Sequence, residues 1–215
     1  MPPDIDFYFD FASPYSYLAA HRIDRIAARR GRKVNWHPLL VTALYQASGT
    51  PPTPTLPVKW EYVRNDVKRI ARSERLPFHE PPGYPRILLE PGRAMLWIRA
   101  AHGDESAVLF ARTCFHAYFG DGVDISDLEV LAGIAGAFGV QKEALLAGMV
   151  DSAIKEEFKR SSALALQQGV FGVPFVIADG EPFWGFDRFP YLEQWLARPR
   201  RVAKAAAAEP QPLPA

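Results

Sequence analysis

The pattern of hydrophobic and polar positions gives this chain a β-containing start, a helical middle and a β-containing end. Residues 5–12 mix aromatic and aliphatic side chains with two aspartates, which is typical of a buried or half-buried strand. Ser13 and Pro14 follow, and these residue types favour the N-cap and the first position of a helix. Apolar residues then recur at three- and four-residue steps as far as Ala27, which predicts a helix that stops at Gly31.

A second strand is predicted where the sequence reads KVNWHPLL, over residues 33–40, with Pro38 ending the pairing. A strand, a helix and a second strand in this order form a βαβ unit. Such a unit almost always has a right-handed crossover, and we expect one here.

The middle of the chain carries helical periodicity and no strand signal. It begins after a proline-rich connection over residues 50–57, TPPTPTLP. From Val58 onward, apolar residues recur with helical spacing, first through residues 63–71 and then through residues 94–98. We therefore predict an all-helical insertion over residues 58–150.

Further helices are predicted within and after this insertion. Residues 106–119 are apolar around most of a helical circumference, which favours a buried helix. Ser126 and Glu129 have the spacing of a capping box, which predicts a helix from there to about Gly139. A helix over residues 151–168 then leads back to the strand signals.

The end of the chain predicts a β-hairpin and a closing helix. Two short strands, residues 175–178 and 182–184, flank Asp179 and Gly180, and Asp-Gly between apolar runs is a strong hairpin signal. A helix over residues 188–196 follows. This gives an αββα unit to complement the βαβ unit at the start.

The order of these units is that of an α/β, thioredoxin-like fold with a mixed sheet and a large all-helical insertion. We expect residues 4–57 and 151–197 to form one discontinuous thioredoxin-like domain around the insertion. Residues 198–215 contain few side chains able to bury apolar surface, which predicts a disordered tail.

Composition and charge restrict the kind of protein. The 215 residues are 48% hydrophobic and 23% charged, which suits one globular domain with a sizeable core. The formal charge of +1 gives no strong field for a nucleic acid or an acidic membrane as partner. The N-terminus lacks the pattern of a signal peptide, and no apolar run approaches the roughly 20 residues of a membrane span. A cytoplasmic location is expected.

Metal and thiol chemistry find little support. Cys114 is the single cysteine, so the chain has no intrachain disulfide and no cysteine-based zinc cluster. It lies in an apolar helical run, which favours a buried small hydrophobic residue over a redox centre. The five histidines show no ligand spacing, and we predict no metal site. They are His21, His37, His79, His102 and His116.

The sequence gives no support for a hydrolytic active site. If Ser13 were a hydrolytic nucleophile it would need a nearby base, and the nearest histidine in sequence, His21, lies about 12 Å further along the predicted helix. The sequence contains no G-x-S-x-G, S-x-x-K, glycine-rich phosphate loop or H-E-x-x-H motif.

Four segments carry a resemblance to a known family. They are FDFASPYSYLA, KWEYVRNDVKR, FGVPFV and FWGFDRFPYLEQWL. In order and spacing they are similar to the kappa-class glutathione transferases and the 2-hydroxychromene-2-carboxylate isomerases, which resemble disulfide oxidoreductases of the DsbA type. The SPYS stretch, Ser13 to Ser16, resembles a glutaredoxin Cys-Pro-Tyr-Cys motif with oxygen in place of both sulfurs. The resemblance covers residues 5–196.

This resemblance implies glutathione as the cofactor and Ser13 as the catalytic residue, whose hydroxyl stabilises the glutathione thiolate. Lowering a thiol pKa by about two units requires roughly 2.7 kcal/mol. One hydrogen bond to a charged acceptor supplies about 1.5–3 kcal/mol, and a helix N-terminus adds up to about 2 kcal/mol. The resemblance further implies a cis bond between Val173 and Pro174, with the Val173 backbone pairing with the cysteinyl part of glutathione.

Five further residues are implied as glutathione ligands. Asp187 and Arg188 match a pair that contacts the γ-glutamyl end, and Lys59 matches a lysine that pairs with the glycyl carboxylate. Phe186 and Thr50 depart from the residues expected there, a small polar residue and an asparagine. Taken alone, Ser13-Pro14 is an ordinary helix cap and Lys59 an ordinary surface lysine.

Aromatic residues supply a candidate wall for an aromatic substrate. They are Tyr15, Trp36, Trp60, Tyr84 and Trp97, although core packing is the favoured role for each one taken singly.

The function implied is a glutathione-dependent cis–trans isomerisation of 2-hydroxychromene-2-carboxylate or a similar unsaturated aromatic acid, by thiolate addition and elimination, in a homodimer. Two alternatives stay open. One is a thiol–disulfide oxidoreductase of the DsbA type, against which the missing cysteines at positions 13 and 16 argue directly. The other is a catalytically silent module that binds glutathione.

Overall fold

The computed structural model describes residues 3–198 of the chain, so nearly all of the predicted tail, residues 198–215, lies outside the described residues. Among the described residues, one sheet of four strands has the order β2-β1-β3-β4. Its strands are β1 (Ile5–Phe9), β2 (Val34–Pro38), β3 (Phe175–Ala178) and β4 (Glu181–Trp184). Strands β1 and β2 are parallel, and the other pairs are antiparallel. This confirms the predicted α/β fold with a mixed sheet.

The alternation of side chains along the strands gives the sheet two buried faces. On one face, Phe7, Phe9 and Trp36 belong to the main hydrophobic core. On the other, Tyr8 and Phe175 belong to a smaller cluster. Because successive strand residues point to opposite faces, this division follows directly from the sequence.

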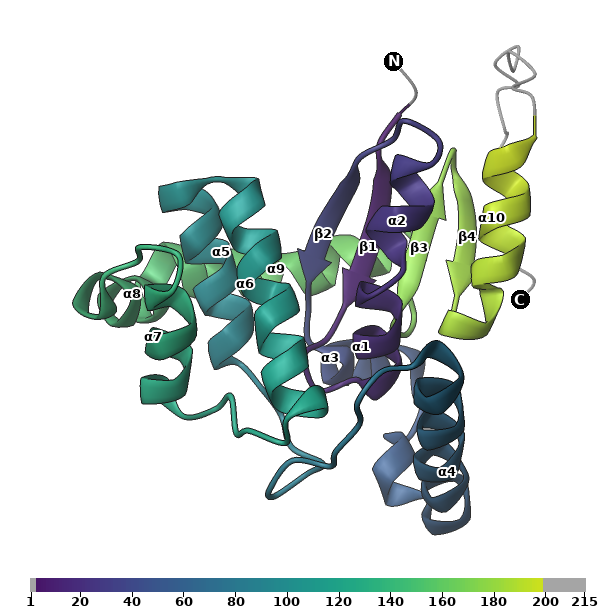
Figure 1. The fold of residues 1–215 in the computed structure, drawn as a ribbon, viewed down its shortest axis with the longest axis horizontal. Helices are drawn as coiled ribbons and strands as arrows, with labels where there is room; N and C mark the ends of the chain where they lie inside the picture. Colours follow the sequence, from purple (N-terminus) through teal and green to yellow (C-terminus); the bar gives the residue numbers. More distant parts are fainter. Residues whose placement is uncertain (1–2, 199–215) are drawn as a thin grey trace, which may run out of the picture.

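Helices cover both faces of the sheet (Figure 1). The helices α1 (Pro14–Ala20), α2 (Ile23–Ala28) and α10 (Phe189–Ala197) supply residues to the main core. The helices α3 (Val41–Ser48) and α9 (Ser152–Gln167) supply residues to the smaller cluster on the other face. The sheet is therefore the middle layer of a three-layer arrangement.

The middle of the chain is helical, as predicted. Its helices are α4 (Pro57–Glu74), α5 (Glu90–His102), α6 (Asp104–Phe115), α7 (Leu128–Gly136) and α8 (Lys142–Val150), with the 3-10 turn η1 (Thr53–Thr55) before them and the π-helical turn η2 (His116–Gly120) after α6. Figure 1 shows α5 to α8 gathered beyond strand β2, with α4 separate from them. The division into a discontinuous domain and an insertion stays a prediction. No helix among residues 3–198 is long and apolar enough to cross a membrane.

The hairpin and the cis bond were predicted correctly. Asp179 and Gly180 have φ angles of 56° and 82°, and two successive positive φ values are what a tight two-residue hairpin needs. The peptide bond between Val173 and Pro174 is cis. A second cis bond, between Tyr84 and Pro85, was not predicted.

The prediction of one helix from Ser13 to Gly31 was wrong. The helix breaks after Ala20, so that α1 has seven residues and α2 begins at Ile23. At the break, the ring Nδ1 of His21 lies 3.0 Å from the Tyr17 carbonyl oxygen, which a continuous helix would use for the His21 backbone N–H. The His21 N–H instead donates to Ala19.

Two element boundaries also differ from the predictions. Strand β1 ends at Phe9 and not at residue 12, because the Asp10 carboxylate turns the chain by accepting the Ala12 N–H. Helix α7 is capped by Asp127, whose carboxylate accepts the Glu129 N–H at 2.8 Å. Ser126 is not the cap, since its hydroxyl donates to Asp124. Helices α3 and α8 were not predicted as separate elements.

Candidate active site

The junction of β1 and α1 places a hydroxyl at the start of a helix. Ser13 is the N-cap of α1, and Pro14 is its first residue, as predicted. The Ser13 Oγ accepts the Ser16 backbone N–H at 3.2 Å. Because this bond uses an oxygen lone pair, the hydroxyl proton of half-buried Ser13 stays available to donate to a ligand.

Directly below this junction, the Asp10 carboxylate joins two loops. Its Oδ1 accepts the N–H of Ala12 and its Oδ2 accepts the N–H of Val41, both at 2.8 Å. Val41 is the first residue of α3, whose N-cap, Leu40, makes no side-chain capping bond. The Asp10 side chain therefore serves as a cap for α3, supplied from the segment that follows β1. Burial raises the pKa of Asp10 to about 6, although both backbone bonds oppose the rise.

A cavity of about 560 Å³ opens beside Ser13. Its lining comes from the start of α1, from α3, from the proline-rich connection and the start of α4, from the segment before α5, and from the strand β3 and β4 region. The described residues that line it are largely apolar or aromatic. This is the composition expected of a pocket for a small organic ligand.

Of the predicted site residues, Ser13, Lys59 and Val173 line this cavity. The Val173 backbone N–H and C=O have no hydrogen-bond partner among the described residues, because the pairing of β3 begins only at Phe175. The next residue, Pro174, accepts the Gly185 N–H through its carbonyl at 2.9 Å. The chain thus offers a free backbone edge within reach of the Ser13 cavity.

The other predicted residues lie outside the cavity lining. The Thr50 hydroxyl accepts a bond from Ser48 Oγ at 3.0 Å, just after α3. Phe186 is buried and packs on Phe189, with ring centroids 5.2 Å apart, so that only its backbone can face a ligand. Asp187 and Arg188 are exposed, and their side chains lie 3.3 Å apart. Their roles as glutathione ligands stay predictions.

The aromatic wall forms from only some of the expected residues. Tyr15, Trp60 and Tyr84 line the cavity, and the Trp60 and Tyr84 ring centroids lie 5.5 Å apart. The Tyr15 hydroxyl donates to Asp66 on α4 at 2.8 Å, which fixes that ring. Trp36 is a core residue of the sheet, and the partly buried Trp97 packs against both the main core and a small cluster near α9.

Cys114 is buried in α6, and burial raises its thiol pKa well above the usual value. It therefore behaves as the small core residue that the sequence predicted, since a buried neutral thiol is a poor nucleophile.

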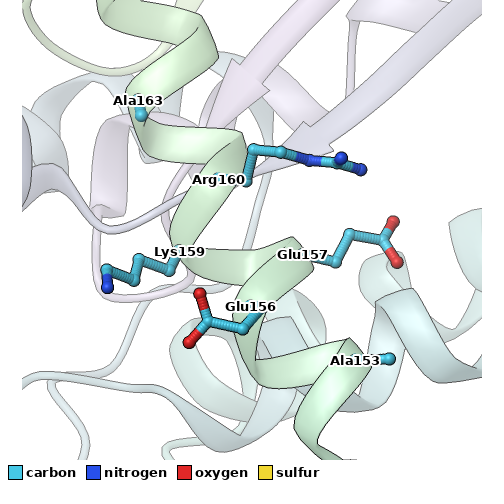
Figure 2. Close-up of a pocket in the computed structure, with 6 residues that line it drawn as sticks. All are labelled: Ala153, Glu156, Glu157, Lys159, Arg160 and Ala163. Carbon is cyan, nitrogen blue, oxygen red and sulfur yellow. The ribbon is translucent and has the colours of Figure 1, made fainter.

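A second hollow lies on the outer surface of α9 (Figure 2). It is lined by six residues of one helix, and Lys159 and Arg160 point to opposite sides of that helix in Figure 2. These side chains do not converge on a common point, so the hollow lacks the arrangement of a binding site.

Sequence reasoning missed Asp10 and Arg86 as site residues. Arg86 lines the cavity from the segment that follows the cis Tyr84–Pro85 bond. The one available signal for Asp10 was a carboxylate inside an otherwise apolar strand run. For Arg86 we find no sequence signal.

Comparisons with known proteins agree with this fold. A model of the DSBA-like thioredoxin domain matches residues 4–197. A 2-hydroxychromene-2-carboxylate isomerase of Sphingobium xenophagum is 31% identical over 91% of this chain and 99% of its own length. Glutathione S-transferase kappa 1 of Homo sapiens is 26% identical over 91% of this chain and 94% of its own. A solved structure of a 2-hydroxychromene-2-carboxylate isomerase superposes with a TM-score of 0.81 at 27% identity, covering 89% of this chain and 93% of that one.

Proposed function

We propose a glutathione-dependent isomerase activity for this chain, which belongs to the family of DSBA-like thioredoxin domains that includes the 2-hydroxychromene-2-carboxylate isomerases and the kappa-class glutathione transferases. Its substrate would be 2-hydroxychromene-2-carboxylate or a similar unsaturated aromatic acid. The observation that carries this proposal is Ser13, which lines a mostly apolar cavity and whose hydroxyl proton has no acceptor among the described residues.

The residues present fit glutathione as a cofactor. Ser13 supplies a donor for a thiolate, and the free backbone edge at Val173 can pair with an extended peptide in the manner of an added strand. Lys59 brings a positive charge to the same cavity, which suits the glycyl carboxylate. Asp187 and Arg188 are proposed for the γ-glutamyl end, with Thr50 and the Phe186 backbone at the margins of the site.

In this chemistry glutathione supplies the reactive group, and residues of the chain stabilise it and bind the substrate. When bound, glutathione supplies a thiolate that adds reversibly to an activated C=C bond, and rotation about the resulting single bond followed by elimination gives the other isomer. The Ser13 hydroxyl holds the sulfur in its ionised form by donating a hydrogen bond to it. The Trp60 and Tyr84 rings flank the space in which a flat electrophile would lie.

Most of the thiolate stabilisation must come from the Ser13 hydrogen bond. Helix α1 has seven residues and ends before His21, so the dipole that it contributes is smaller than that of the long helix expected from the sequence. A hydrogen bond to a charged acceptor supplies about 1.5–3 kcal/mol, which corresponds to a thiol pKa lowered by about one to two units.

Thiol–disulfide exchange is disfavoured as an alternative. It needs an attacking thiolate from the protein. The single cysteine of the chain, Cys114, is buried in α6, and positions 13 and 16 carry hydroxyls.

The test is a calorimetric titration with glutathione, followed by ultraviolet measurement of thiolate formation across a pH series. We expect wild type to bind glutathione with the thiol pKa lowered by about one to two units. Ser13→Ala should return the pKa of the bound thiol close to that of free glutathione and lower kcat/KM by about 10- to 100-fold.

Ser16→Ala is the matched control for this experiment. It removes a hydroxyl from the same motif, and that hydroxyl is buried without a hydrogen-bond partner among the described residues. We expect it to leave the thiol pKa unchanged. If Ser13→Ala and Ser16→Ala behaved alike, or if wild type bound no glutathione, the proposed function would fail.

A homodimeric state, a cytoplasmic location and a place in aromatic degradation are further proposals, supported by the resemblance to the isomerases and transferases named above. Light scattering after gel filtration tests the first of them, since a monomer at working concentration would contradict it.

A further inference from the structure

The charges around the cavity all have one sign. Lys59 and Arg86 are the charged residues in its lining, and no carboxylate lines it among the described residues. The two cations come from different elements, since Lys59 lies on α4 and Arg86 in the segment before α5. One cation accounts for the glycyl carboxylate of glutathione, so the second has no role in the proposed function as stated.

The Arg86 side chain is held in place from one side only. Its Nη1 donates to Asp124 Oδ2 at 2.5 Å and to Ser126 Oγ at 2.8 Å. Asp124 is itself fixed, because its Oδ1 accepts both the N–H and the hydroxyl of Ser126. Of the five N–H donors of a guanidinium, the three on Nη2 and Nε have no partner among the described residues.

A second arginine in the same protein shows what a purely structural guanidinium looks like. Arg32 uses all three of its nitrogens, donating to the carbonyls of Pro3 and Asp4 and to both carboxylate oxygens of Asp179. Arg86 bonds through one nitrogen, and its side chain is 36% exposed. A planar fork of donors therefore remains for a partner outside the chain.

Arg86 lines the cavity together with part of the aromatic wall. Burial raises the pKa of the buried Tyr118, and the positive charge of Arg86 opposes that rise. The Tyr118 ring in turn makes an edge contact with Tyr84, with centroids 6.3 Å apart, and Tyr84 lines the cavity. Asp124, which neutralises part of the Arg86 charge, does not line the cavity.

We propose that Arg86 binds the carboxylate of the aromatic electrophile and so makes the enzyme selective for acids over uncharged analogues. This inference rests on the proposed function for its thiol partner. Lys59 would then bind the glycyl carboxylate of glutathione, and Arg86 would bind the carboxylate of the substrate. Asp124 and Ser126 act as positioning residues, because they hold the guanidinium of Arg86, which lines the cavity together with Trp60 and Tyr84.

The first test measures turnover of 2-hydroxychromene-2-carboxylate and of its methyl ester at fixed glutathione concentration. Arg86→Met keeps most of the side-chain length and removes the charge. We expect it to lower kcat/KM for the acid by about 10- to 100-fold and for the ester by less than about threefold. Arg86→Lys should restore part of the activity on the acid, since it keeps the charge and loses the fork. Equal losses on acid and ester would overturn the proposal.

A second measurement does not depend on glutathione. Calorimetry compares the binding of cinnamate and methyl cinnamate to the full chain. Wild type should bind the acid more tightly than the ester, and Arg86→Met should abolish that preference. A preference that persists in Arg86→Met would overturn the inference even if the proposed isomerase activity were correct, and its loss would support the inference even if no glutathione bound.

Arg64→Met is the matched control. It makes the same change of charge in an arginine that pairs with Glu80 and does not line the cavity. It should leave both the acid preference and the glutathione Kd as in wild type. If Arg64→Met shifted the acid preference as much as Arg86→Met, the effect would be one of net charge and the proposal would fail.

Discussion

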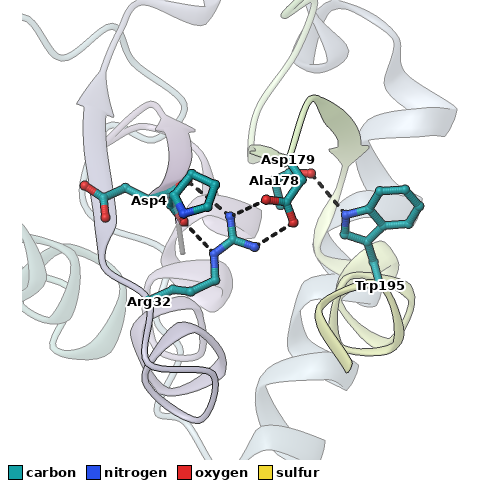
Figure 3. A network of polar contacts seen from close by, with 6 residues as sticks. Asp4, Arg32, Ala178, Asp179 and Trp195 are labelled. Atoms are coloured by element: carbon teal, nitrogen blue, oxygen red, sulfur yellow. Dashed lines mark hydrogen bonds and ion pairs between the residues drawn. The ribbon is translucent and has the colours of Figure 1, made fainter. Parts of the chain in front are cut away.

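The two ends of the sheet differ in whether their polar groups have hydrogen-bond partners within the chain. At the end where β1 begins, Arg32 is buried and bonds to Asp179 and to two backbone carbonyls, while Trp195 donates to the Ala178 carbonyl (Figure 3). These bonds join the N-terminus, the hairpin turn and the last helix. At this closed end, each nitrogen of the buried guanidinium has a partner within the chain.

At the open end, where β1 finishes, the chain leaves donors and acceptors unused. The buried charge there is the Asp10 carboxylate, which is held by two backbone N–H groups and not by a cation. Above it, the Ser13 proton, the Val173 backbone and part of the Arg86 fork have no partners among the described residues. The difference indicates that the closed end stabilises the fold and the open end is arranged to receive a ligand.

The largest effect expected from this comparison is on stability, at the closed end. Arg32→Met removes a buried guanidinium that bonds to two backbone carbonyls and to the partly exposed Asp179 carboxylate. Since one hydrogen bond of a charged group contributes about 1.5–3 kcal/mol, we expect the free energy of unfolding to fall by roughly 3–5 kcal/mol. The Arg32 side chain is 4% exposed, so little solvent is present to replace the lost bonds. Denaturant unfolding measures the loss.

The control for Arg32→Met is Arg64→Met, whose arginine is 45% exposed, so that its removal should change the free energy of unfolding far less. The folded fraction of Arg32→Met should still bind glutathione as wild type does. A stability loss as small as that of the control, or a changed glutathione Kd, would contradict the separate roles inferred for the two ends.

The next largest effect is a pH dependence at the open end. The pKa of Asp10 is raised from 3.8 to about 6 in the folded protein, so between these values the folded state binds more protons than the unfolded state. The contribution of Asp10 to stability is therefore present below about pH 4 and is lost as pH rises through 6. The loss is about 3 kcal/mol.

The variant Asp10→Asn isolates this contribution. We expect the difference in free energy of unfolding between wild type and Asp10→Asn to fall across pH 4 to 6 and to stay level above pH 7. Unfolding measured in urea across that pH range gives the slope. A flat difference would mean that the Asp10 carboxylate is not the titrating group.

The smallest effect concerns Lys59, which is exposed at the margin of the cavity. Lys59→Met should raise the glutathione Kd by about two- to fivefold, and added salt should shrink the difference. Lys68→Met is the control, because Lys68 is on the same helix and lies 3.5 Å from Glu80 outside the cavity lining. An equal change of the glutathione Kd in both variants would show that Lys59 does not bind glutathione.

The sequence predicts those parts of the molecule that depend on local patterns. The sheet and the hairpin follow from alternation and from Asp179-Gly180, whose conformations are set within a few residues. The break at His21 was missed because it arises from one ring competing for a carbonyl. Helix α3 was missed for a similar reason, since its first N–H is capped by a residue 31 positions earlier.

The site residues likewise divide into those that short segments predict and those that depend on distant contacts. Ser13, Lys59 and Val173 were found through the resemblance of short segments to a family. Arg86 depends on contacts 38 and 40 positions away, and Asp10 on a contact with another loop, so periodicity and motif spacing do not reveal them.

The hydrogen bonds of Asp10 to two loops have a consequence for the binding and release of ligands. Since one carboxylate bonds to both Ala12 and Val41, we expect these two parts of the cavity lining to move together. We therefore expect any widening that admits a bulky acid to occur in other lining segments, the proline-rich connection and the segment around Tyr84. Binding and release of a ligand would then depend on the mobility of these two segments.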